Sequence, residues 1–304
     1  MARATGSIDV VPHAAEVPLR ILVMIVAIGL WILFVLSVIG LVYGVMLGLF
    51  FFFVHLSLIS HLRGSSIKIG PDQLPGLYSR VVNIARRIGM DPVPDVYLQQ
   101  SGGVLNAFAT RFGRRRFVVL YSDLIRACGN NVDALDFIIA HELGHIHRGH
   151  LNWRWLIAPA LFIPFLGTAY SRACEYTCDR YGFQASSDPD RSLDGLCILA
   201  AGSQFVSYVN REAFVAQRDD LNTAFMKIGQ WFATHPPLAR RVAALAPNLE
   251  QPGGDGTVAT VGALLILAAL LVGPIFGGVW FARTIENAKN QFSNQLGGPA
   301  YLQR

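Results

Sequence analysis

The sequence predicts a mainly helical α+β protein, in which transmembrane helices accompany a soluble domain with a small antiparallel sheet. Three observations lead to this fold class. The 304-residue chain is 53% hydrophobic and only 15% charged, whereas a soluble domain carries about 25% charged residues. Its apolar residues gather in two long uncharged blocks. The region between these blocks shows mostly helical periodicity with three short extended runs.

The composition also excludes several classes of protein. A disordered chain needs low hydrophobicity and high charge, and four cysteines in 304 residues cannot form a disulfide scaffold. The formal net charge of +5 is too small to predict binding to nucleic acid, but it fits a protein that lies against anionic lipid. We therefore expect a lipid bilayer, and no nucleic acid, among the partners.

The first apolar block covers residues 21–60 and contains no Asp, Glu, Lys or Arg from Ile21 to Ile59. A helix crosses the hydrocarbon core of a bilayer with about 20 residues, so this block is nearly twice one span. It predicts a transmembrane hairpin of two helices that turns near a glycine, at Gly40, Gly44 or Gly48. One long helix is the alternative. The preceding leader, residues 1–20, carries Asp9 and Glu16 and does not resemble a signal peptide.

The second block predicts a C-terminal transmembrane helix over residues 257–281, kinked at Pro274. A flexible linker at 250–256 separates it from the preceding domain, and residues 282–304 form a tail. A third stretch, 155–170, is apolar but has 16 residues and two prolines. It is too short for a clear span, and we expect it to dip into the membrane interface or to face lipid.

Basic residues flanking the spans predict the orientation, since cytosolic loops carry an excess of Lys and Arg. They are Arg20, Arg63, Lys68, Arg80, Arg86, Arg87, Arg240 and Arg241. If the first block is a hairpin, the leader and the region at 61–250 share the cytosolic side. The four cysteines, Cys128, Cys174, Cys178 and Cys197, are then expected to be free, packed thiols.

The soluble domain, residues 61–250, is long enough to bury its own core. Apolar residues at helical spacing predict a helix from Leu77 that ends at Gly89. Extended runs predict strands at Asp95–Gln99, Val104–Arg111 and Phe117–Tyr121, the last two joined as a hairpin by the turn at 112–116. In this turn, the basic run Arg114, Arg115 and Arg116 is expected to be solvated, and contact with lipid phosphates is the alternative. Asn130–Asn131 predicts the start of a mostly helical region.

The residues that indicate chemistry are His141, Glu142 and His145 in the segment HELGH. Positions four apart on a helix lie one turn apart on the same face, so the two imidazoles can bind one metal ion. Glu142 lies beside them. This is the zinc-protease arrangement of two histidine ligands and a carboxylate base. A chance match on a histidine-rich helix is the alternative.

Two further histidines follow the motif. At about 100° per residue, His147 and His150 point roughly 240° and 180° away from His141, while His145 lies about 40° away. If the helix continues, both face elsewhere. We expect them to lie at the surface, at an interface or at the helix end.

A catalytic zinc takes three protein ligands and keeps a fourth position for water. Glu175 is the best candidate for the third ligand. Asp179 follows four residues later on the same helical face, where it can hold a ligand imidazole by its second nitrogen. Alone, this pair predicts only an exposed acidic helix, but beside the HELGH motif it favours a metal site.

At this point the chain resembles a known family. The HELGH motif, the Glu175–Asp179 pair, Asn106-Ala107-Phe108 and the Thr-His-Pro-Pro segment at 234–237 together resemble the HtpX-like zinc metallopeptidases, whose wider group includes the CaaX prenyl proteases. The resemblance covers residues 70–247. It implies a zincin-like domain at 61–250 with one zinc ion on His141, His145 and Glu175, and Glu142 as the general base. It also assigns Arg241, six residues after His235, to the family pattern.

The chain departs from these relatives in its spans. HtpX-type proteins usually place two further spans between the motif helix and the third ligand, whereas 29 residues separate His145 from Glu175 here. CaaX proteases enclose their site in a chamber of many helices, which three strong spans cannot build. We therefore do not expect processing of prenylated proteins.

The remaining motif residues receive roles consistent with the resemblance. The segment 104–110 is expected to be an edge strand near the site, to which an extended polypeptide substrate adds by main-chain hydrogen bonds. Asn106, Ala107 and Phe108 would contact that substrate, and a solvent-facing role for Asn106 is the alternative. His235 would donate a hydrogen bond to the oxyanion. Arg241 would orient the site by pairing with a carboxylate.

The sequence predicts a membrane-anchored zinc metalloendopeptidase of the bacterial cell membrane that acts on unfolded or damaged membrane proteins from the cytosolic side. Two alternatives stay open. One is a catalytically silent membrane adaptor with a structural zinc ion, and the other is a dedicated processing protease for one membrane partner. The sequence leaves the oligomeric state undetermined.

Overall fold

The computed structural model of the chain describes residues 6–249 and 256–296. The predictions for residues 1–5 of the leader, 250–255 of the linker and 297–304 of the tail lie outside this part. The chain divides into two compact units. The first contains Met1–Asp219 and Gln230–Gly253, and the second contains Asp220–Gly229 and Gly254–Arg304.

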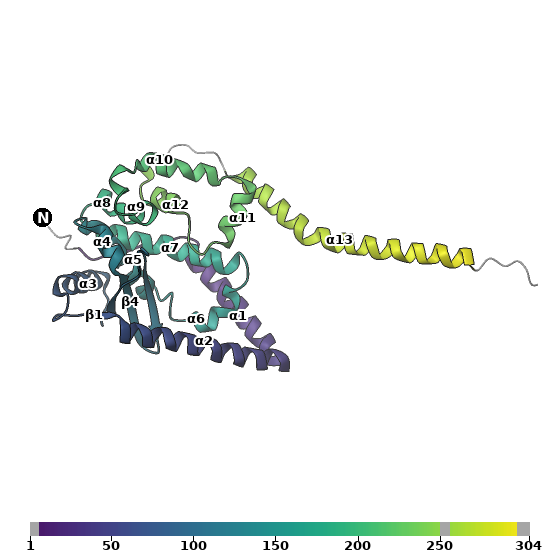
Figure 1. The fold of residues 1–304 in the computed structure, drawn as a ribbon, viewed down its shortest axis with the longest axis horizontal. Helices are drawn as coiled ribbons and strands as arrows, with labels where there is room; N and C mark the ends of the chain where they lie inside the picture. Colours follow the sequence, from purple (N-terminus) through teal and green to yellow (C-terminus); the bar gives the residue numbers. More distant parts are fainter. Residues whose placement is uncertain (1–5, 250–255, 297–304) are drawn as a thin grey trace, which may run out of the picture. The chain divides into compact units, whose positions relative to one another are not determined.

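The first apolar block forms two helices, α1 (Glu16–Leu36) and α2 (Val38–Ser65), as predicted and not as one long helix (Figure 1). The break lies at Ser37, which has extended backbone angles and is three residues before Gly40, one of the glycines near which the turn is predicted. The hydroxyl of Ser37 accepts a hydrogen bond from the main-chain N–H of Gly40 at 3.1 Å. Serine therefore starts the second helix as its N-cap, and the glycines lie inside that helix.

Both helices are long and apolar enough to cross a membrane. In α1 the buried residues are Glu16, Val23 and Ala27, and in α2 they are Ile59 and Leu62. The other large apolar side chains of these helices are mostly exposed. Exposed apolar surface of this extent is typical of contact with lipid.

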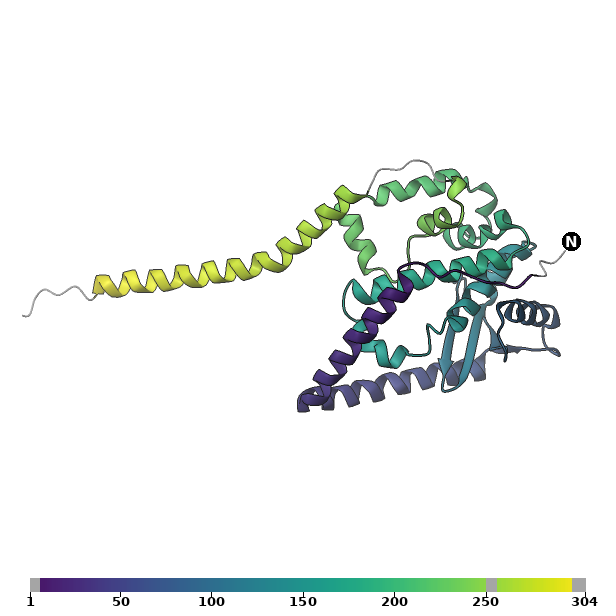
Figure 2. The same cartoon turned by 180° about the vertical axis from the view of Figure 1, so that it is seen from behind.

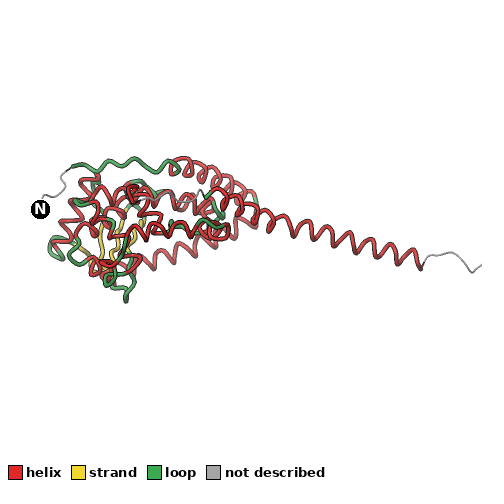
Figure 3. The backbone as a smooth tube through the Cα atoms, turned by 90° about the horizontal axis from the view of Figure 1, so that it is seen from above, coloured by secondary structure: helices red, strands yellow, loops and turns green. Residues whose placement is uncertain are grey.

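A four-stranded sheet forms one layer of the first unit (Figure 3). Its strands are β1 (Ile67–Ile69), β2 (Asp95–Gln99), β3 (Ala107–Phe112) and β4 (Arg115–Tyr121), in the order β1-β2-β4-β3. The predicted strand at Val104–Arg111 begins three residues later, and the hairpin turn is shorter than predicted. The edge position of β3 is confirmed, since it pairs with β4 alone.

The sheet is mixed, so the prediction of a purely antiparallel sheet is wrong at one pairing. β1 with β2 and β3 with β4 are antiparallel, but β2 and β4 are parallel, with Val96 opposite Val118. The second strand of the hairpin joins β2 because it is apolar on both faces. In β4 the residues from Phe117 to Leu120 are all buried, whereas every residue of β3 is only partly buried. The more apolar strand therefore takes the central position.

Helices cover both faces of this sheet. Val118 and Leu120 pack with α3 (Pro75–Ile88), which ends at Gly89 as predicted. Phe117 and Val119 point to the other face and pack with Ile59 and Leu62 at the end of α2. Side chains along β4 alternate between the two faces of the sheet. Those on the second face therefore hold the end of α2, a candidate membrane helix, against the soluble domain.

The two helices that carry the motif residues, α5 (Val132–His147) and α7 (Leu166–Ala185), pack directly against each other. Asn131 caps α5 through a hydrogen bond from the N–H of Ala134 at 3.1 Å, as the sequence predicts. Gly182 of α7 lies so close to α5 that a Cβ atom there would be 2.7 Å from the carbonyl oxygen of Phe137. A residue without a side chain thus sets the spacing of these two helices.

The remaining helices of the domain are short. They are α4 (Ser122–Cys128), α6 (Arg154–Leu161), α8 (Pro189–Ser192), α9 (Asp194–Ala201), α10 (Arg211–Ala216), α11 (Ala224–Phe232) and α12 (Leu238–Leu245). Single 3-10 turns occur at Val206–Tyr208, Gln217–Leu221 and Pro247–Leu249. All four cysteines are free and buried, as expected, and burial raises the pKa of the Cys128 thiol to about 12.

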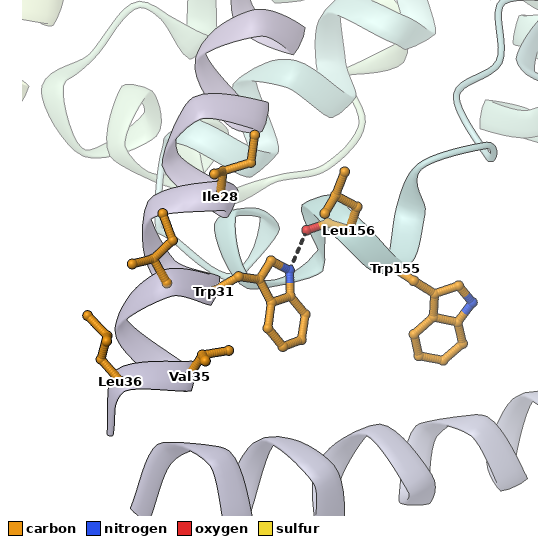
Figure 4. A pocket seen from close by; sticks show the side chains of 7 residues that line it. Ile28, Trp31, Val35, Leu36, Trp155 and Leu156 are labelled. Atoms are coloured by element: carbon orange, nitrogen blue, oxygen red, sulfur yellow. Dashed lines mark hydrogen bonds between the residues drawn. The ribbon is translucent and has the colours of Figure 1, made fainter. Parts of the chain in front are cut away.

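The stretch 155–170 forms no single helix, because α6 ends at Leu161 and α7 begins at Leu166. Helix α6 packs on α1, where Ile157 and Ala160 meet Val23 and Ala27. The indole N–H of Trp31 donates to the carbonyl of Leu156 at 2.7 Å, beside an apolar pocket between the two helices (Figure 4). Contact of this stretch with the membrane interface stays a prediction.

The leader packs against the soluble domain (Figure 2). Ile8 and Val10 are buried in the core formed by α3, α5 and the sheet. The N–H of Ile8 donates to the carbonyl of Arg87 at 2.8 Å, and Arg180 donates to the carbonyl of Val11 at 2.7 Å. The leader and the domain must therefore lie on the same side of any membrane that α1 and α2 cross.

The second unit contains α13 (Thr257–Leu296), which runs through Pro274 as one helix. A helix is therefore confirmed at the predicted C-terminal span of residues 257–281. Within the residues whose side chains the structure describes, the apolar part of this helix is Thr257–Leu270. That this helix crosses a membrane stays a prediction.

Candidate metal centre

Three predicted ligands come together between α5 and α7. The Nε2 atom of His141 lies 3.4 Å from Oε2 of Glu175, and the Nε2 atom of His145 lies 3.4 Å from Oε1 of the same carboxylate. One donor atom from each of the three residues lies within 4.8 Å of the others. Two imidazole nitrogens and one carboxylate oxygen form a donor set that zinc prefers.

The charges in this cluster favour a cation at its centre. Burial lowers the pKa of His141, but the carboxylates of Asp179 and Glu175 outweigh this effect and raise the pKa to about 10. Burial also opposes ionisation of Glu175, yet hydrogen bonding to His141 and His145 holds its pKa well below the usual value. The residues present therefore fit a divalent metal ion in both donor type and charge.

Asp179 and Arg241 support the cluster from behind. Nδ1 of His141 lies 3.0 Å from Oδ1 of Asp179, and Arg241 donates two hydrogen bonds to the same carboxylate, at 2.8 and 2.6 Å. Burial would raise the pKa of Asp179, but the Arg241 guanidinium lowers it below its usual value. Asp179 is thus the carboxylate with which Arg241 pairs, and it also contacts Nδ1 of His141, the ring nitrogen that does not face Glu175.

Glu142 lies beside His141 on α5 and is 8% exposed. A carboxylate next to a metal cluster can accept a proton from a bound water molecule.

His235 reaches the cluster from the segment that precedes α12. Its Nε2 atom lies 3.5 Å from Oε1 of Glu175, and its side chain is 65% exposed. Arg172 of α7 holds the preceding chain by donating to the carbonyls of Trp231 and Ala233 at 3.0 and 2.7 Å. His235 therefore marks the side of the cluster that is open to solvent.

The three predicted substrate contacts lie at the sheet edge next to α5. Ala107 and Phe108 belong to β3, and Ala107 packs with the core that contains Ile139 and Leu143 of α5. Asn106 is exposed and precedes the strand. Its side-chain oxygen accepts a hydrogen bond from the N–H of Ala107 at 2.9 Å.

The orientation predicted for His150 does not hold. It required a continuing helix, but α5 ends at His147, so His150 lies just beyond the helix end. Gly149, with φ +73, reverses the chain and returns the His150 ring to His145, with their Nδ1 atoms 3.1 Å apart. Glu16, which the sequence analysis does not assign to the site, lies 3.3 Å from Nε2 of His150. No local sequence pattern predicts this contact, because Glu16 belongs to the leader and is distant from His150 in the sequence.

Comparison with known proteins agrees with this geometry. The family model "Peptidase family M48" matches residues 72–163 and 154–248, which together cover more than half of the chain. The chain belongs to peptidase family M48. The expected HtpX-like relationship and zincin-like domain are thereby confirmed, and membership of a metallopeptidase family implies a metal ion.

Several relatives of this M48 chain are proteases by name. It is 26% identical over 250 residues to a protease HtpX homolog of Gemmatimonas aurantiaca, covering 69% of this chain and 88% of the relative. It is 29% identical over 226 residues to a protease HtpX homolog of Polynucleobacter necessarius, covering 60% and 77%. A plastoglobule-localized metallopeptidase 48 of Arabidopsis thaliana is 27% identical over 186 residues, covering 56% of this chain and 53% of the relative. The match thus spans about half of the plant protein. No solved structure matches the chain.

Proposed function

We propose that the chain is a membrane-anchored, zinc-dependent metalloendopeptidase that hydrolyses peptide bonds of unfolded or damaged membrane proteins. One observation carries the proposal: His141, His145 and Glu175 present three zinc-type donor atoms within 4.8 Å of one another. With three protein ligands, a fourth position is left for water.

In this mechanism His141, His145 and Glu175 hold the metal. When bound, zinc would polarise the substrate carbonyl and lower the pKa of its water toward about 7. Glu142 accepts the proton of the attacking water and passes it to the leaving amine. His235, on the exposed side of the cluster, donates a hydrogen bond to the oxyanion.

Other residues position these groups. Asp179 holds Nδ1 of His141 at 3.0 Å, and Arg241 holds Asp179. The free edge of β3 offers main-chain donors and acceptors to an extended substrate, with Asn106, Ala107 and Phe108 at its start. Main-chain pairing depends little on the substrate side chains, which suits a protease acting on many unfolded chains.

The same proposal places the protease domain on the cytosolic side of a bacterial cell membrane. Helices α1 and α2 supply two apolar spans, and the packed leader requires the chain to return to the side on which it starts. Basic residues flank the spans on that side, as expected for cytosolic segments.

Removal of the metal tests the proposed activity. We expect the protein in detergent, treated with a chelator, to lose cleavage of unfolded casein to background. One equivalent of Zn²⁺ per chain should restore it, because the three donor atoms lie within 4.8 Å of one another and can share one ion. Measurement of metal content alongside cleavage controls for residual zinc, and full cleavage by metal-free protein would contradict the proposal.

A comparison of substrates separates broad from dedicated cleavage. We expect several unrelated unfolded proteins to be cleaved at similar rates. If cleavage is confined to a single co-purifying membrane protein, a dedicated processing role is correct instead.

A further inference from the structure

The chain brings Glu16, the first residue of α1, next to a proposed metal ligand. Glu16 is fully buried, although it precedes a long apolar helix. Arg148 donates to its Oε1 atom from Nε at 3.2 Å and from Nη2 at 2.9 Å. The ring of His150 lies 3.3 Å from the same oxygen. Both neighbours contact Oε1 of this buried carboxylate, whereas Oε2 has no hydrogen-bond partner among the described residues.

His150 lies between Glu16 and His145. Its side chain is 5% exposed, and its main-chain N–H donates to the carbonyl of His145 at 3.1 Å. Nδ1 of His150 is 3.1 Å from Nδ1 of His145. The other ring nitrogen, Nε2, has no hydrogen-bond partner of standard geometry among the described residues, and it lies 3.3 Å from Oε1 of Glu16. This ring therefore lies between His145 and Glu16, and its Nδ1 atom also lies 3.8 Å from Sγ of Cys178.

The positions of the ring hydrogens in this chain of contacts follow from chemistry. The Nε2 atom of His145 faces Glu175, and an imidazole that gives Nε2 to a metal carries its hydrogen on Nδ1. That hydrogen needs an acceptor, so Nδ1 of His150 must be unprotonated and its own hydrogen must be on Nε2. The hydrogen on Nε2 of His150 then lies on the side of the ring that is 3.3 Å from the carboxylate of Glu16.

We propose that Glu16 and His150 form a hydrogen-bond relay that fixes the ring of His145, so that the first residue of a candidate membrane helix positions a metal ligand. This inference rests on the proposed function, because it needs a metal on His145. Histidine ligands commonly donate their second nitrogen to a carboxylate or carbonyl. Asp179 lies 3.0 Å from the second nitrogen of His141, and the relay gives His145 the equivalent support through one intervening ring.

A structural role for Glu16 is the main alternative. The ion pair with Arg148 alone would anchor α1 to the domain, and loss of Glu16 would then lower stability without changing the metal site. A second alternative is a metal bound by His145, His150 and Cys178, which also lie within 4.8 Å of one another. In that case loss of His150 removes a ligand, and loss of Glu16 has little effect.

Zinc affinity tests the relay in the full-length protein in detergent. The variants are Glu16→Gln, His150→Leu, their combination, and His150→Gln, whose amide can both accept from His145 and donate to Glu16. The matched control is His147→Leu, which removes a histidine that contacts Tyr181. The zinc dissociation constant is measured by competition with a chromophoric chelator. The visible spectrum of the Co²⁺-substituted protein reports ligand geometry, and thermal unfolding of the metal-free proteins reports folding.

We expect Glu16→Gln and His150→Leu each to weaken zinc binding by roughly 10- to 100-fold and to alter the cobalt spectrum. The double variant should bind no more weakly than His150→Leu, since both changes break one relay. His150→Gln should recover most of the affinity, and His147→Leu should leave it unchanged.

Several results would overturn the relay. One is wild-type zinc affinity with an unchanged cobalt spectrum in Glu16→Gln. Another is a loss of zinc affinity in the double variant that equals the sum of the two single losses. A third is an equal loss of zinc affinity in His147→Leu. If His150→Leu does not fold, the isosteric Glu16→Gln decides alone. A wild-type protein without zinc binding would refute the proposed function together with the relay. Normal wild-type zinc binding with normal Glu16→Gln binding refutes the relay alone.

Discussion

The Glu142→Gln variant should retain its zinc and lose peptide hydrolysis. Glu142 is not among the three clustered donors, so the metal site stays intact. A glutamine cannot accept the proton of the attacking water, and general base catalysis contributes about 100- to 10,000-fold. We expect kcat/KM on unfolded casein to fall by at least about 100-fold, with zinc content per chain unchanged.

The matched control for this variant is Glu212→Gln, which makes the same substitution at an exposed position in α10. It should cleave at the wild-type rate. Equal thermal unfolding of both variants shows that the loss is chemical. Wild-type cleavage by Glu142→Gln would assign the base to another residue.

The second large effect is expected in Glu175→Ala. This change removes the carboxylate that lies 3.4 Å from both ligand imidazoles. The loss of zinc affinity should exceed that of Asp179→Asn, which alters only the support of His141 and should cost roughly 10- to 100-fold. Chelator competition measures both affinities under the same conditions.

The order of these two losses is informative. If Asp179→Asn binds zinc more weakly than Glu175→Ala, the two carboxylates have exchanged roles. If Glu175→Ala keeps full zinc occupancy at wild-type affinity, the third ligand is a different residue.

Sequence reasoning predicts the local elements of this protein well. The helix around HELGH, its Asn131 cap and the end of α3 at Gly89 all follow from patterns within one or two turns. His141, Glu142 and His145 share one helix, and Glu175 with Asp179 share another. The sequence thus places them in two groups, and the structure brings the two groups together.

Other features depend on contacts between distant segments. The parallel pairing of β2 with β4 depends on which strand of the hairpin is more deeply buried. The turn between the two strands predicts that they pair with each other, but not which of them pairs with β2. The break at Ser37 depends on a single capping hydroxyl. The contact of His150 with Glu16 joins residues more than one hundred positions apart and depends on the chain reversal at Gly149.

Zinc K-edge X-ray absorption of the wild-type protein identifies the atoms that bind the metal. If one ion binds to His141, His145 and Glu175, we expect two imidazole ligands and further oxygen ligands at about 2.0–2.2 Å, with no sulfur. A zinc–sulfur distance of about 2.3 Å would contradict it, because the metal would then lie in the cluster of His145, His150 and Cys178.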